Sequence, residues 1–85
     1  MGNYINKNMK EYTTKEVANH NKYGDGWVIL SGYVYDISTF KHPGGMGLLT
    51  KVYGTDATKV FYSIATHGSR HKKKLNNYLI GKVKN

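Results

Sequence analysis

The sequence contains no cysteine in 85 residues, and this absence limits how so short a chain can form a stable fold. A domain of this size buries only about 60% of the surface that its unfolded chain exposes. Small domains usually compensate with disulfides, a structural metal, a cofactor or a partner. Because neither a disulfide nor a thiolate metal site is available, we expect a non-covalent cofactor or a partner to stabilise the fold.

Basic residues strongly outnumber acidic ones, with thirteen Lys and Arg against five Asp and Glu and a formal net charge of +8. This balance indicates an acidic partner, such as nucleic acid, an anionic membrane surface or an acidic protein. The alternative is that the lysines only solvate the surface. The longest apolar run covers residues 27–30, so we expect neither a transmembrane anchor nor a signal peptide. A soluble, cytoplasmic monomer is expected, with at most peripheral contact to anionic membranes.

Local signals in the first half predict one short helix and a hairpin. Thr13 and Glu16 have the spacing of a capping box, which predicts a helix over about 14–20. Two apolar, partly β-branched runs at 27–30 and 33–36 flank a Ser-Gly pair. Such a pair between two strand-like runs predicts a tight turn.

Helical spacing dominates the second half. GLLTKVYG is expected to form a helix that stops at Gly54, and TDATKVFYSIA a helix with Asp56 as its N-cap. SRHKKKLNNYL predicts a helix that begins after Ser69, and LIGKV a closing strand. The expected inward residues of the three helices are Leu48, Leu49 and Val52; Ala57, Val60, Phe61 and Ile64; and Leu75, Tyr78 and Leu79. The fold class is therefore α+β, with one domain at 10–83 between an N-terminal extension at 1–9 and a tail at 84–85.

The segment 40–45, FKHPGG, holds the sole proline of the chain next to a histidine. Pro43 fixes the backbone at the start of the next helix, and the glycines after it leave room for a bulky group. His67 lies 25 positions after His42, beyond two predicted helices. If these helices pack antiparallel, the two imidazoles face each other across apolar side chains. Such a slot suits a flat, iron-bearing ring, whereas His67 and His71 could form only half of a zinc site.

The motifs, in their order, resemble those of the cytochrome b5 family. The matching stretches are YTTKEVANHN, WVILSGYVYDIS, FKHPGG, YGTDATKVF, HGS and YLIGKV, which together cover about residues 12–83. The resemblance implies a small mixed sheet with short helices that form a haem pocket. It also implies non-covalent haem b with His42 and His67 as the axial iron ligands, and it places Trp27 in a second, smaller core. The pocket positions implied by the resemblance are Leu30, Ile37, Phe40, Gly44, Leu48, Leu49, Phe61, Ile64, Leu75 and Leu79.

The sequence departs from the family pattern around both ligands. One residue separates Phe40 from His42, and one extra residue lies between Phe61 and His67. Ser69 is the candidate for the propionate contact, because the residue directly after His67 is a glycine. His71 stands where the family has a small pocket residue, which makes it a rival to His67 as iron ligand.

The resemblance implies a one-electron carrier and not an enzyme. Iron with two axial histidines has no open position for dioxygen or substrate, so the expected step is one-electron transfer. The chain has no flavin or nicotinamide fingerprint, so a separate NAD(P)H-dependent reductase is the expected donor. Lys51, Lys59 and the basic stretch at 69–74 predict an acidic-surfaced redox acceptor, such as a lipid-modifying or other redox enzyme.

Two alternatives remain at this point. The stretch SRHKKKLNNY could belong to a basic module that binds nucleic acid or an anionic membrane surface. That module leaves HPGG and the two histidines unexplained, so we do not expect nucleic-acid binding. A haem-storage or haem-sensing protein on the same fold would instead exchange its haem readily.

Overall fold

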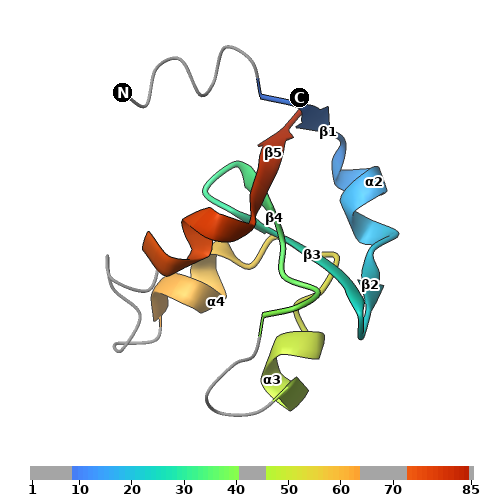
Figure 1. Cartoon of the computed structure of the whole chain (residues 1–85), viewed down its shortest axis with the longest axis vertical. Helices are drawn as coiled ribbons and strands as arrows, with labels where there is room; N and C mark the ends of the chain where they lie inside the picture. The colour runs from blue at the N-terminus through green and yellow to red at the C-terminus, as the bar shows by residue number, and fades with distance from the viewer. Residues whose placement is uncertain (1–8, 41–45, 64–72, 85) are drawn as a thin grey trace.

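A five-stranded mixed sheet forms the centre of the molecule, with strands in the order β1-β5-β4-β3-β2 (Figure 1). The computed structural model describes residues 9–40, 46–63 and 73–84. The strands are β1 (Glu11–Tyr12), β2 (Asn21–Lys22), β3 (Asp25–Leu30), β4 (Tyr33–Asp36) and β5 (Leu79–Val83). β1 pairs with β5 in parallel, and the other neighbours pair antiparallel.

Short helices flank this sheet. They are α2 (Thr14–Ala18), α3 (Met46–Thr50), α4 (Thr58–Ser63) and the 3-10 helix η1 (Asn76–Tyr78), which helical residues 73–75 precede. The predicted α+β class and the mixed sheet are therefore confirmed. Within the described residues, no helix has the length and apolarity needed to cross a membrane.

The predicted hairpin turn and helix cap are both present in the structure. Ser31 and Gly32 have φ angles of 52° and 85°, as a two-residue turn with a left-handed backbone requires. The Thr13 hydroxyl accepts a hydrogen bond of 3.0 Å from the Glu16 N–H at the start of α2. α2 ends at Ala18 and not at residue 20, because the Asn19 and His20 N–H groups donate to carbonyls three residues back as the chain turns into β2.

The sheet separates two hydrophobic cores, because successive side chains of a strand point to opposite faces. Val28 and Leu30 of β3 pack in the larger core, whereas Ile29 packs in the smaller one. The buried residues of the larger core, called the pocket cluster here, are Val28, Leu30, Tyr35, Ile37, Leu49, Tyr53, Ala57 and Leu75. The smaller core contains Val17, Ile29 and Val34, with Tyr12, Trp27, Ile80 and Val83 packed against it.

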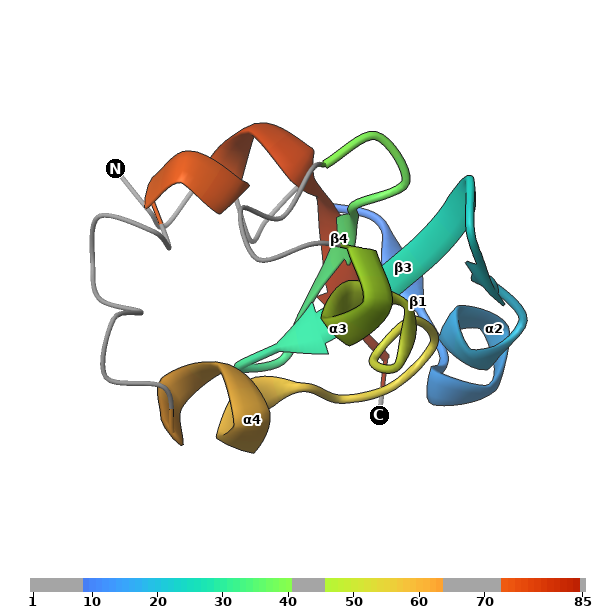
Figure 2. The same ribbon diagram turned by 90° about the horizontal axis from the view of Figure 1, so that it is seen from below.

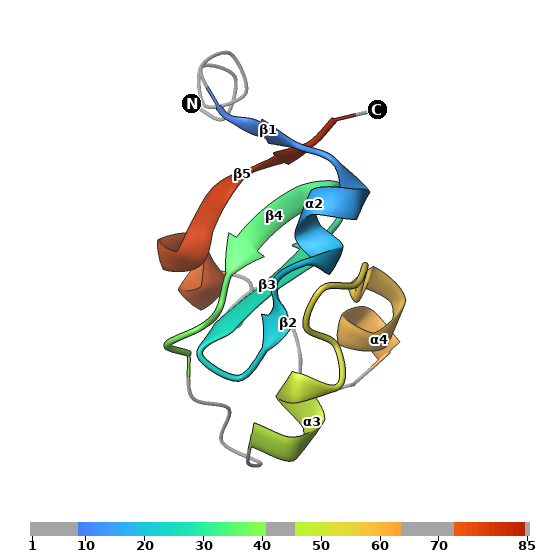
Figure 3. The same ribbon diagram turned by 90° about the vertical axis from the view of Figure 1, so that its right-hand side faces the viewer.

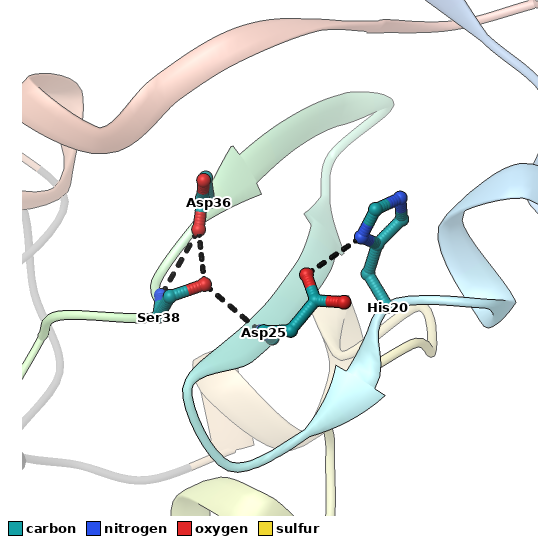
Figure 4. A network of polar contacts seen from close by, with 5 residues as sticks. His20, Asp25, Asp36 and Ser38 are labelled. Atoms are coloured by element: carbon teal, nitrogen blue, oxygen red, sulfur yellow. Dashed lines mark hydrogen bonds and ion pairs between the residues drawn. The ribbon is translucent and has the colours of Figure 1, made fainter.

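Trp27 occupies the smaller core, as predicted. The His20 ring stacks on it with 3.6 Å between ring centroids, and Tyr12 meets it edge-on at 4.8 Å. His20 Nδ1 lies 2.7 Å from Asp25 Oδ1 (Figure 4). In Figure 2, α2 lies at one end of the molecule, and α4 with residues 73–78 lies at the other.

Backbone and side-chain hydrogen bonds fasten the start of α4 to β3. The Ile29 N–H donates to the Thr55 carbonyl, and the Ala57 N–H donates to the Ile29 carbonyl, both at 2.9 Å. Asp56 Oδ1 accepts from both the N–H and the hydroxyl of Thr58. The Thr58 hydroxyl oxygen in turn accepts from the Ser31 N–H at 2.8 Å. Figure 3 shows α4 beside the sheet and separate from α2.

The N-cap predicted for this helix is displaced by one residue. Phe61 donates the first helical hydrogen bond to the Ala57 carbonyl at 2.8 Å, so Ala57 holds the N-cap position. Asp56 lies one residue earlier and still satisfies the Thr58 N–H at 3.0 Å. Ala57 is drawn inward because its side chain is buried in the pocket cluster.

Replacing Gly26 by Ala is expected to destabilise the fold by about 2 kcal/mol or more, because overpacking forces neighbours apart. A Cβ at this position would lie 2.4 Å from the ring of Tyr53. Gly47→Ala in α3 is the matched control, since in the described part of the chain no atom lies within 4 Å of its added Cβ. Urea unfolding measures the free energy of unfolding of each variant. Equal values for the two variants would contradict the close packing of Tyr53 on β3.

Thr58→Val is expected to cost about 1 kcal/mol of stability, because it removes the acceptor for Ser31 and the hydroxyl donor to Asp56. Thr58→Ser keeps the hydroxyl and serves as the control. Thermal unfolding, followed by circular dichroism, should place Thr58→Ser near the parent protein and Thr58→Val clearly below it. Indistinguishable melting of the two variants would show that these hydrogen bonds do not hold α4.

Candidate cofactor site

Seven of the residues assigned to the pocket from the sequence come together in one apolar cluster. Leu30, Ile37, Leu49 and Leu75 are buried members of the pocket cluster. Phe40, Phe61 and Leu79 are partly buried and pack against it. These side chains come from β3, the loop after β4, α3, α4, the helical segment 73–75 and β5.

A polar network fixes the loop that carries Ile37 and Phe40 (Figure 4). Asp36 Oδ1 accepts from the Ser38 N–H at 3.1 Å and from the Ser38 hydroxyl at 2.5 Å. The Ser38 oxygen accepts from the Gly26 N–H at 2.9 Å, which ties the end of β4 to the start of β3. This loop leads directly into segment 41–45, so the network fixes the position from which that segment begins.

Aromatic contacts extend the pocket cluster toward the C-terminal segment. Phe40 meets Tyr78 of η1 edge-on, with 5.4 Å between ring centroids. The predicted inward position of Tyr78 is confirmed, because this residue is half-buried and packs against the pocket cluster. The loop after β4 and η1 therefore contact each other at the cluster.

Val60 does not take the inward position that helical spacing predicted. Its side chain is 53% exposed, whereas Ala57 is buried and Phe61 is half-buried. Neighbouring residues of a helix differ by about 100° around its axis. Because Ala57 and Phe61 set the inner face of α4, Val60 lies on one flank and Tyr62 on the other.

Several predicted site residues lie outside the part of the chain that the structure describes. They are His42, Gly44, Ile64, His67, Ser69 and His71. Leu48 belongs to α3, but its side chain is not described. α3 begins directly after segment 41–45, and α4 ends directly before residue 64. The two helices that border the pocket cluster thus adjoin the segments that carry the two histidines.

Sequence reasoning missed Tyr53, which is 3% exposed within the pocket cluster. Its ring packs on Gly26, and its hydroxyl is buried without a hydrogen-bond partner in the described structure. Burial, together with the nearby Tyr23, raises the pKa of Tyr53 above its usual value. No local signal marked this residue, because Tyr53 lies in the turn after α3, which ends at Thr50, and its partner Gly26 is distant in the sequence.

The described part of the site suits an apolar group. Within the described residues, the buried side chains are aliphatic or tyrosine and none is charged, and no three His, Asp or Glu residues lie close enough to hold a metal ion. Phe40, Phe61 and Leu79 pack against the cluster yet keep part of their surface exposed. A planar macrocycle would cover such side chains, and covering apolar surface is favourable by about 25 cal/mol per Å².

Comparison with known proteins agrees with this geometry. The family model described as cytochrome b5-like haem/steroid binding domain matches residues 13–84. Among solved structures, cytochrome b558 of Ectothiorhodospira vacuolata superimposes with a TM-score of 0.79 at 28% identity, over 87% of this chain and 98% of that one. Cytochrome b5 of Ostreococcus tauri virus 2 superimposes with a TM-score of 0.77 at 35% identity, over 86% of this chain and 95% of that one.

Curated relatives include whole cytochromes and larger enzymes. The chain is 39% identical over 80 residues to cytochrome b5 of Oryza sativa subsp. japonica, which covers 92% of this chain but only 58% of that protein. It is 38% identical over 82 residues to nitrate reductase [NADH] 1 of Phaseolus vulgaris, which covers 94% of this chain and 9% of that protein. The match spans nearly the whole of this chain, so the chain belongs to the cytochrome b5-like haem/steroid binding domain family.

Proposed function

We propose that the chain is a one-electron carrier that holds one haem b non-covalently between His42 and His67. The observation that carries the proposal is the convergence of seven predicted pocket residues on one apolar cluster, in a chain of this family. Non-covalent haem b is the cofactor that family membership implies. Membership also favours this function over nucleic-acid binding, which would require neither the pocket cluster nor the histidine pair.

Each part of the chain has a defined role in the proposed site. Haem b bound by two histidines supplies a reversible one-electron change at its iron. Leu30, Leu49 and Phe61 exclude water from the pocket and lower its polarity, which influences the reduction potential. Ser69 is proposed to contact a propionate, and Gly44 to leave space for the ring edge.

The register after the pocket supports His67 over His71 as the second ligand. His67 stands 14 residues before Gly81, a spacing that matches the family, so the extra residue lies before His67. Gly81 is fixed in β5, where it is paired with Val34 of β4. We therefore propose His67 as the iron ligand and assign His71 no bond to the iron.

The donor and acceptor are proposed as separate proteins. The chain has no dinucleotide fingerprint of its own, so we propose a NAD(P)H-dependent reductase as the donor. The relative from Phaseolus vulgaris is named as a nitrate reductase that uses NADH, and this chain matches only 9% of it. An acidic-surfaced redox enzyme is the proposed acceptor. A monomeric state and a cytoplasmic location stay predictions from the sequence.

His67→Ala is expected to abolish six-coordinate haem binding, because it removes one axial nitrogen. His71→Ala should leave the visible spectrum nearly unchanged. The measurement is the absorption spectrum of the purified ferric and ferrous proteins, with carbon monoxide added to the reduced form. The parent protein should be low-spin and bind carbon monoxide poorly.

A high-spin parent spectrum or fast carbon monoxide binding would overturn the two-histidine carrier. Five-coordinate iron in His71→Ala, with six-coordinate iron retained in His67→Ala, would reverse the ligand assignment. The same spectra show whether any haem is bound, so they also test the function itself.

Exposed lysines should make electron transfer depend on salt. Lys51 and Lys59 are exposed, and their attraction to an acidic partner is screened over about 8–10 Å at physiological ionic strength. Transfer to an acidic redox protein should slow as salt rises, and transfer to a basic cytochrome should speed up. The double variant Lys51→Glu and Lys59→Glu should reverse both trends with an unchanged spectrum. Rates independent of salt in both proteins would show that docking uses another surface.

A further inference from the structure

The net charge of the chain is confined to its second part. Residues 1–36 contain four basic and four acidic residues, whereas residues 37–85 contain nine basic residues and one acidic residue. That acidic residue, Asp56, accepts hydrogen bonds from Thr58 at the start of α4. The segments after the hairpin, which include the helices of the pocket cluster, therefore carry a large excess of positive charge, and only one carboxylate offsets it.

Three described lysines of this part lie on the helical segments at the pocket end of the molecule. Lys59 lies on α4, and Lys73 and Lys74 lie in the helical segment that leads into η1; all three are exposed. Figures 1 and 2 both show α4 and residues 73–78 toward the same end of the molecule, and Figures 2 and 3 show the two segments apart from each other at that end. Lysines on these two segments thus give one end of the protein a positive potential.

An exposed aromatic side chain lies within this positive end. Tyr62 of α4 is 44% exposed. Lys59 is three residues earlier, and residues three apart are neighbours on a helix surface. The Tyr62 ring also meets the ring of Phe61 edge-on, with 5.1 Å between centroids, and Phe61 packs against the pocket cluster. Tyr62 therefore connects the outer surface of the molecule with the wall of the pocket.

We propose that Tyr62 and Lys59 form the centre of a docking surface for a protein partner whose contact face places Asp and Glu carboxylates around an apolar hollow. Tyrosine is enriched at the centre of protein interfaces because it buries a large rigid ring and keeps a polar tip. Lys73 and Lys74 lie on the other helical segment at this end of the molecule, where their charges steer the encounter and reject basic proteins.

A protein partner fits this surface better than a membrane does. Membrane-surface helices need a broad apolar face, whereas α4 spans six residues with a lysine and a tyrosine side by side. The docking proposal rests on the proposed function in one respect. A partner seated on Tyr62 lies next to Phe61, and so next to the pocket, which gives a short path for an electron.

The test measures binding of two labelled peptides to the holoprotein by fluorescence anisotropy. Both peptides have equal length and equal glutamate content; one has leucines between the glutamates, and the other has serines. The leucine peptide should bind about tenfold more tightly or better, as burial of one aromatic ring predicts. Tyr62→Ser should remove this preference, Tyr62→Phe should keep it, and Lys59→Glu should weaken both peptides.

Matched controls come from the other end of the molecule. Tyr23 is 75% exposed in the turn between β2 and β3, and Lys15 is exposed on α2. Tyr23→Ser and Lys15→Glu should leave the binding of both peptides unchanged. The visible spectrum of each variant is recorded first, so that a failure of haem binding is separated from a failure of docking.

Several results would overturn the proposal. They are an unchanged leucine preference in Tyr62→Ser, an equal loss in Tyr23→Ser, or tighter binding to phosphatidylserine vesicles or single-stranded DNA than to the leucine peptide. Retention of the preference by Tyr62→Phe together with its loss in Tyr62→Ser would support the ring as the docking element.

Discussion

The alternation of side chains along β3 and β4 determines which residues face each of the two hydrophobic cores. Val28 and Leu30 face the pocket cluster, while Ile29 between them faces the smaller core. A shift of one residue in the pairing would exchange the two faces, so the hairpin turn at Ser31 and Gly32 fixes the identity of both cores. The smaller core is closed by α2 and by the rings that surround Trp27. The larger core is bordered by short helices that depend on contacts with the sheet.

Those contacts explain how helices of five or six residues hold a site. Isolated helices of this length are unstable in water, so α3 and α4 need tertiary support. α4 receives it from Ile29 through backbone hydrogen bonds and from Ser31 through Thr58. α3 receives it from Leu49, which is buried against the sheet. The partly buried aromatic rings at the edge of the pocket cluster remain available to a flat cofactor, which would complete the larger core.

Sequence reasoning predicted the elements whose signals are local. The N-cap at Thr13, the Ser-Gly turn and the apolar alternation of β3 each depend on neighbouring residues, and each is confirmed. The pocket residues were predicted from the family resemblance. Helical or strand periodicity could not predict them, because they come from six separate segments of the chain. Val60 was predicted on the wrong face, because the phase of α4 is set by the burial of Ala57 against β3. The cap predicted at Asp56 is displaced by one residue for the same reason, although Asp56 Oδ1 still accepts from the Thr58 N–H. Tyr53 was missed because its partner, Gly26, is distant in the sequence. The roles of the two histidines stay predictions.

Amide hydrogen exchange of the protein with and without haem b tests the central claim, that the cofactor completes the larger core. Binding to the folded state alone stabilises that state, and the gain should concentrate where the cofactor makes its contacts. Removal of haem should accelerate exchange in α3, α4 and residues 73–79, and should leave Val17, Ile29 and Val34 of the smaller core well protected. Equal exchange in both states across α4 and residues 73–79 would show that the cofactor does not complete this core.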